Sequence, residues 1–98
     1  MTTATTPAGA KPPLSLPVCH LNGSGKKNLM DAREAIWDAL ETAADRLRAG
    51  APNGRDYYPD GPAAMEAALE QHRWRLAVLR EIQADLETEM AHVQEAGR

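Results

Sequence analysis

The feature that most constrains this chain is the stretch from residue 63 to residue 95, which contains neither glycine nor proline. Apolar side chains recur within it at spacings near three and four, as the buried stripe of a helix requires. The stripe comprises Met65, Leu69, His72, Leu76, Leu79, Leu86, Met90 and Val93, and only Gln83, beside Ile82, breaks it. Pro62 suits a first helical position, and Asp60 or Gly61 can cap it. The sequence therefore predicts a helix over residues 62–95.

A second helical pattern precedes this one, over residues 24–48. Its stripe consists of Met30, Trp37, Leu40, Ala44 and Leu47, flanked by Leu29 and Ile36. Ser24 is the best candidate for the N-cap, and Gly50 is placed to end the helix in the left-handed conformation. Two helices joined by a loop over residues 49–61 predict an all-α chain folded as an antiparallel hairpin.

The first 23 residues do not continue this pattern. Residues 1–13 are mostly Thr, Ala, Pro, Gly and Lys, a composition with too little apolar surface to offset the entropy of ordering, so we expect a disordered tail. Residues 14–23 are expected to form an extended arm. Counting outward from the loop, the first helix begins level with about residue 85 of the second. Leu86, Met90 and Val93 then overhang, and we expect the arm to fold back onto them.

A chain of 98 residues has a marginal core, and a single Cys19 cannot form an internal disulfide. We therefore expect this small domain to gain its further stability from oligomerisation. Trp74 and Val78 lie off the main stripe of residues 62–95, which indicates a second apolar face. We therefore predict a homo-oligomeric helical bundle; the alternative is that Trp74 lies along the surface beside Arg73 and Arg75.

Composition excludes several classes of function. The net charge of −3 argues against binding a nucleic acid polymer. No apolar run is long enough to cross a membrane, and the N-terminus lacks the charge and apolar block of a signal peptide, so we expect a cytoplasmic protein without membrane partners. No nucleophile stands beside a base, and the three histidines are widely spaced. We expect neither an enzyme nor a bound metal or cofactor.

The loop carries the strongest functional signal, because both tyrosines of the chain lie in it. Asn53 and Gly54 indicate a turn, and they are followed by Arg55, Asp56, Tyr57 and Tyr58. Arginine binds phosphate or carboxylate, aspartate accepts from hydroxyls, and tyrosine rings stack on bases. These residues therefore predict a nucleotide-like site. The alternative is structural: a tyrosine plugs the open end of the hairpin, and Arg55 and Asp56 pair with helix ends.

A second candidate segment is HLNGSGKK, which begins at His20. Its candidate ligand-binding residues are His20, Asn22 and Lys26. Amide groups and lysine charge converge at the start of a helix, where an anion is favoured; the alternative is an ordinary helix cap with solvated lysines. In one hairpin this segment lies about 35 Å from the loop at 1.5 Å per residue. The two segments are therefore either unrelated or joined into a composite site by oligomerisation.

With HLNG followed by a helix and then APNGRDYYP-GP, residues 16–93 resemble a group of short helical proteins of bacteriophages and prophages. By type, these look like phage counter-defence proteins that sequester cyclic-nucleotide or ADP-ribose immune signals. The resemblance implies that this chain is a cytoplasmic binding protein in the infected host, with a small anionic nucleotide-like ligand. The alternative function is a phage structural, assembly or protein-inhibitor module that acts through its helical faces.

Overall fold

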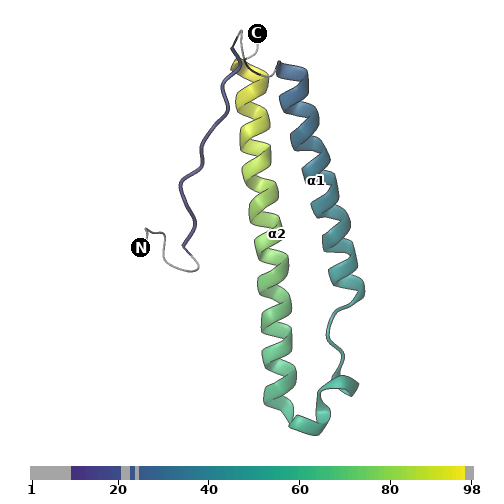
Figure 1. The fold of residues 1–98 in the computed structure, drawn as a ribbon. Helices are drawn as coiled ribbons and strands as arrows, with labels where there is room; N and C mark the ends of the chain where they lie inside the picture. The colour runs from purple at the N-terminus through teal and green to yellow at the C-terminus, as the bar shows by residue number, and fades with distance from the viewer. Residues whose placement is uncertain (1–9, 21–22, 24, 97–98) are drawn as a thin grey trace.

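The computed structural model describes residues 10–20, 23 and 25–96, and two antiparallel helices dominate them (Figure 1). Helix α1 is Lys26–Ala49 and helix α2 is Pro62–Ala96. Two short 3₁₀ turns, η1 (Gly54–Asp56) and η2 (Tyr58–Asp60), lie between them, and these described residues contain no strand. The predicted helical hairpin is confirmed.

The helix ends differ in detail from the prediction. Helix α1 begins at Lys26 with extended Gly25 at the N-cap and no side-chain cap bond there, while Ser24 lies outside the described residues. Gly50 has φ −99°, so the left-handed prediction is wrong. The helix ends instead through ordinary backbone bonds, from the Gly50 N–H to the Arg46 carbonyl (3.0 Å) and from the Ala51 N–H to the Arg48 carbonyl (3.2 Å). The positive φ falls on Gly61, at 92°, where the chain turns into Pro62.

The register of the hairpin is the main correction. Arg33 Nε donates to Glu89 Oε1 at 2.8 Å. Arg33 lies seven residues after Lys26, and Glu89 lies seven residues before Ala96, so the start of α1 is level with the end of α2. The predicted overhang at the C-terminal end of α2 is wrong. The chain does not reverse direction directly after α1. The loop first runs beside the first turns of α2 (Figure 1).

The buried residues lie where α1 and α2 face each other. Val93, Ala44 and Leu86 are buried, and the other members of the predicted α2 stripe are half-buried, which confirms the stripe. Gln83 does not break it, because this side chain is fully buried. Its Nε2 donates to the Trp37 carbonyl (3.3 Å) and to Glu41 Oε1 (3.1 Å), and its Oε1 accepts from Arg80 (2.7 Å). The buried amide is thus hydrogen-bonded at both ends, as burial of a polar group requires.

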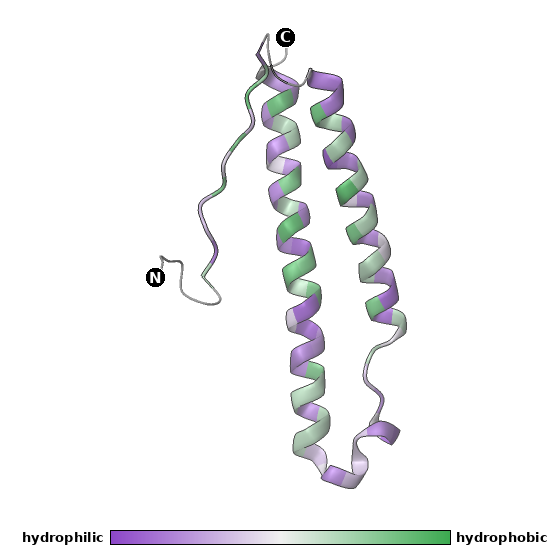
Figure 2. Ribbon diagram, in the orientation of Figure 1, coloured by the Kyte–Doolittle hydropathy of each residue, from purple (hydrophilic) through white to green (hydrophobic). Residues whose placement is uncertain are grey.

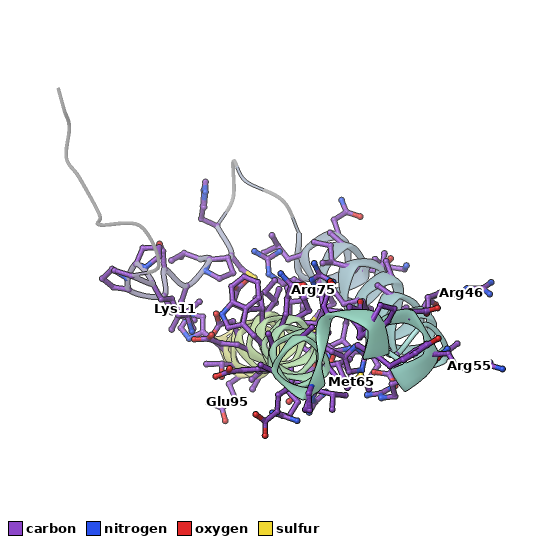
Figure 3. All side chains as sticks on the ribbon, turned by 90° about the horizontal axis from the view of Figure 1, so that it is seen from below. Lys11, Arg46, Arg55, Met65, Arg75 and Glu95 are labelled. Carbon is purple, nitrogen blue, oxygen red and sulfur yellow. The ribbon has the colours of Figure 1, made fainter. Side chains whose placement is uncertain are left out.

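The arm lies against α2 on the side opposite α1 (Figures 1 and 3). Lys11 Nζ contacts Asp85 Oδ1 at 2.9 Å and Glu81 Oε2 at 3.1 Å, and its hydrogen bonds to these carboxylates raise the pKa of Lys11. Lys11, which the prediction placed in the tail, therefore contacts α2, and Pro12 and Pro13 line the space between the arm and α2. A cavity between arm and helix is lined by Val78 and Ile82, so this is the face that the arm flanks, and Leu86, Met90 and Val93 are not part of that lining.

Candidate functional site

The loop is held by a chain of short-range hydrogen bonds. Asn53 Oδ1 accepts from the Arg55 N–H at 2.9 Å and starts η1. The Tyr57 N–H then donates to the Gly54 carbonyl, and the Gly61 N–H donates to the Tyr58 carbonyl, both at 3.1 Å. Each turn begins where the previous one ends, so the backbone of the loop is fixed. The oxygen of Asn53 is used in this turn, and its NH₂ group is the part that a ligand can meet.

The two adjacent tyrosines have different surroundings. Tyr57 is half-buried and borders a shallow, open depression against α2. The other residues around that depression are Asp60, Ala64, Ala67, Ala68 and Gln71. The half-buried Tyr57 therefore lines this depression together with small alanine side chains of α2. Tyr58 is 76% exposed, and its ring is open to solvent.

Arg55 and Asp56 are both exposed on η1. Figure 3 shows Arg55 projecting outward on the same side as Arg46 and away from the arm that carries Lys11. No ion pair involving Arg55 or Asp56 is formed among residues 10–20, 23 and 25–96. The cation of Arg55 is therefore available to an anion from solvent, and it does not pair with a helix end in this part of the chain.

The segment at the other end of the hairpin precedes the start of α1, and its described residues are His20, Gly23 and Gly25. The Gly23 N–H donates to the His20 carbonyl at 3.1 Å, and a Cβ at Gly23 would stand 2.5 Å from Nε2 of the exposed His20 ring. Lys26 is half-buried as the first residue of α1. Lys27 pairs with Asp31 at 2.6 Å, and that hydrogen bond raises the pKa of Lys27. Asn22 lies outside the described residues.

The structure does not bring the two candidate segments together within one chain. The loop lies at one end of the hairpin, and the start of α1 lies at the other (Figure 1). The 24 residues of α1 separate them by roughly 36 Å at 1.5 Å per residue. A single small ligand contacts only one of these segments in one protomer.

Sequence reasoning missed Asp60 and Gln71, the polar residues that border the depression beside Tyr57. The available signal was the cluster of alanines at the start of α2, since small residues on a helix leave space for a neighbouring ring. The described residues hold no group of three or more His, Cys, Asp or Glu side chains that could bind a metal ion. No helix among them has the length and apolar character needed to cross a membrane.

Comparison with known proteins adds no assignment: no family model, curated protein or solved structure matches the chain.

Proposed function

We propose that this chain is a small phage binding protein that sequesters a nucleotide-like immune signal and so blocks host defence. The observation that carries the proposal is the loop: a hydrogen-bonded turn that presents an unpaired Arg55 and an exposed Tyr58 ring three residues apart. A cation and a flat ring on a fixed backbone suit a phosphate and a base of one ligand. Because the turn is already formed, little ordering entropy opposes binding.

The loop alone is too open to enclose a ligand, so a second surface is needed. Small-molecule sites normally bury most of the ligand, whereas the depression beside Tyr57 is shallow. Within the proposal, the start of α1 from another copy supplies the missing wall, with His20 and Lys26 facing the loop. The ligand then lies between two chains, and assembly and binding are coupled.

Calorimetry with a panel of cyclic dinucleotides, cyclic trinucleotides and cyclic ADP-ribose isomers tests the proposal. Arg55→Ala should weaken binding about ten- to a hundredfold, because a charge-assisted hydrogen bond to phosphate contributes about 1.5–3 kcal/mol. Arg46→Ala is the matched control, since it removes the same charge from the same end of the hairpin without touching the loop. Equal losses for the two variants would show long-range attraction and not a site at Arg55.

Tyr58→Ala should reduce affinity by a similar factor if its ring stacks on a base, which is worth about 1–3 kcal/mol. Its melting temperature should not change, because the side chain is 76% exposed. Tyr58→Phe is the control that keeps the ring and removes the hydroxyl. No binding by the wild-type protein to any member of the panel would refute the nucleotide proposal.

The second candidate function is an assembly or inhibitor module that binds a larger protein through its helical faces. The observation in its favour is exposed apolar area on the helices themselves, where Trp74 is 64% and Ile36 is 47% exposed. Native mass spectrometry of the protein from infected cells distinguishes the two functions. A retained mass of a few hundred daltons supports the ligand, and a retained polypeptide supports the module.

A further inference from the structure

Helix α2 has a second face, distinct from the one that packs on α1. Its apolar members are Trp74, Val78 and Ile82, spaced four residues apart, and Trp74 and Ile82 are 64% and 40% exposed. The arm flanks this face beside Val78 and Ile82, whereas Trp74 lies beyond the arm and borders an open depression with Ala67, Glu70 and Gln71. Within residues 10–20, 23 and 25–96, the arm therefore flanks one end of the second face and leaves Trp74 at the other end exposed.

Beneath the arm there is unfilled space. The cavity between arm and α2 has a volume of about 370 Å³. Its lining combines apolar and polar residues: Pro12, Pro13, Leu14, Val78 and Ile82, together with Lys11, Ser15, Glu81, Asp85 and Glu89. One water takes about 30 Å³, so the cavity is large enough for a bulky side chain. The cavity is open to solvent, so a side chain from another molecule can enter it.

The spacing along α2 is compatible with a second copy of this chain at the cavity. Trp74 and Ile82 lie four residues on either side of Val78, and Gln71 and Asp85 lie seven residues on either side of it. A twofold axis at Val78 would therefore pair two antiparallel copies of α2 with Trp74 of each level with Ile82 of the other. Arg73 and Arg75 flank Trp74, whereas the cavity is lined by three carboxylates and one cation, Lys11, which pairs with Glu81 and Asp85. The lining therefore keeps an excess of negative charge opposite the two arginines.

We propose that two copies of this chain pair through the second face of α2, with each Trp74 indole inserted into the cavity between the arm and α2 of the other copy. The contact is isologous, because the same residues contribute from both sides. The indole N–H lies among carboxylates that can accept it, and its apolar surface leaves water. In this dimer the arm covers part of α2 and also forms one side of the cavity that receives the Trp74 indole of the other copy.

This pairing has a consequence for the ligand site, and that consequence rests on the proposed function. Residue 96 lies eighteen residues after Val78, and residue 60 lies eighteen residues before it. Because α1 begins level with residue 96, the twofold axis brings the start of α1 of one copy level with η2 of the other. The pairing thus places these two candidate segments, from different copies, at the same level along the dimer, although α1 packs on a different face of α2 from the one that pairs.

Oxidative cross-linking of cysteine variants tests the geometry directly, without any ligand. In a Cys19→Ser background, Val78→Cys should form a disulfide-linked dimer, because the residue meets its own copy at the axis. Gln71→Cys and Asp85→Cys should cross-link when mixed and not when alone. If each of the three variants formed a disulfide-linked dimer by itself, the two copies of α2 would pair in parallel. If no variant formed one, alone or mixed, this face would not be the interface. Either result overturns the proposal.

Fluorescence tests the insertion of the indole. In Trp37→Phe, Trp74 is the remaining tryptophan, and its emission should shift to shorter wavelength and resist acrylamide quenching as protein concentration rises through the dimer range. Trp74→Ala should raise the dimer dissociation constant at least about 30-fold in sedimentation experiments, the factor that corresponds to a 2 kcal/mol hot spot. Ile36 is an exposed apolar residue on α1, and Ile36→Ala is the control: it should change the dimer dissociation constant by no more than a few-fold. An emission spectrum independent of concentration would overturn the proposal.

The two proposals fail separately. Cross-linking at Val78 without binding of any nucleotide would refute the ligand and leave the pairing intact. Nucleotide binding by a protein that does not cross-link at Val78 would refute this pairing and leave the binding function intact.

Discussion

The two halves of α2 differ in what they face. From Leu79 to Val93 the helix packs on α1, and this half contains the buried side chains of Gln83, Leu86 and Val93. From Pro62 to Trp74 the helix lies mainly beside the loop, and none of its residues is buried. In Figure 2 the first turns of α2 are pale, because they are rich in alanine, whereas stronger apolar colour lies in the other half.

We infer from this difference that one half of α2 mainly stabilises the fold and the other half mainly binds a ligand or partner. The half that packs on α1 contains the core and the buried hydrogen bonds, so substitutions there should act on folding. The half beside the loop has the Tyr57 depression and Trp74, so substitutions there should act on ligand or partner binding. Sites that bind are commonly drawn from the less stable parts of a fold.

The largest contrast is expected between two leucines of the same stripe. Leu86→Ala should lower the free energy of unfolding by about 2–5 kcal/mol, because the side chain is 7% exposed and its loss leaves a cavity. Leu69→Ala should cost clearly less, since Leu69 is only half-buried beside the loop. Urea unfolding at one fixed protein concentration measures both, and equal losses would contradict the division of α2 into two halves.

The next effect concerns the ion pair that joins α1 to the C-terminal half of α2. Arg33 and Glu89 side chains are 20% and 16% exposed, at 2.8 Å. Arg33→Ala should lower the stability by about 1–3 kcal/mol, because it leaves a mostly buried carboxylate without its donor. Arg48→Ala breaks the exposed pair with Asp45 and should cost less than about 1 kcal/mol. Thermal unfolding of the two variants compares them, and a larger loss for Arg48→Ala would contradict the assignment.

A smaller contrast is expected between the tyrosines. Tyr57→Ala should lower the melting temperature by a few degrees, because the half-buried ring rests on α2 and loses about 1 kcal/mol of burial. Tyr58→Ala should leave the melting temperature unchanged. Calorimetric melting of both variants checks this, and the reverse order would mean that Tyr58 is the ring that packs.

The smallest effect on stability is expected for a substitution of Gln83, which should instead alter the register of α1 along α2. Gln83→Leu keeps a similar volume, and the side chains that lose their partner, Arg80 and Glu41, are exposed and half-buried, so water can bond to them in its place. The hydrogen bonds to Trp37 and Glu41 hold α1 at one level along α2, and without them a shifted register becomes accessible.

Spin labels at Ala35→Cys and Ala91→Cys, in a Cys19→Ser background diluted with unlabelled protein, report that register. In the native register the labels are offset by four residues, roughly 6 Å along the axis at 1.5 Å per residue. If α1 began level with residue 85, they would be offset by roughly 22 Å. Gln83→Leu should populate a longer distance, whereas Gln94→Leu, the same change at an exposed position, should not. A single short distance in Gln83→Leu would show that other contacts set the register.

The sequence by itself determined the two helices, the stripe on α2 and the position of the loop. Periodic apolar side chains between Gly and Pro signals are local information, and the structure confirms α2 from Pro62 onward and the burial of Leu86 and Val93. It also placed Arg55 and the tyrosines together, since they are consecutive in the chain. Their role as ligand-binding residues stays a prediction.

Only the tertiary structure decided which turn of α1 meets which turn of α2. Two apolar stripes with spacings of three and four can pack against each other at several positions along the helix axis. Periodicity therefore does not determine the register of α1 on α2. Contacts between distant residues, Arg33 with Glu89 and Glu41 with Gln83, select one level. In this register the part of α2 that does not pack on α1 is its beginning and not its end. The structure also distinguishes the two tyrosines, since Tyr57 is half-buried and Tyr58 is exposed. The physical reason is that register depends on pairs far apart in sequence, which no local pattern records.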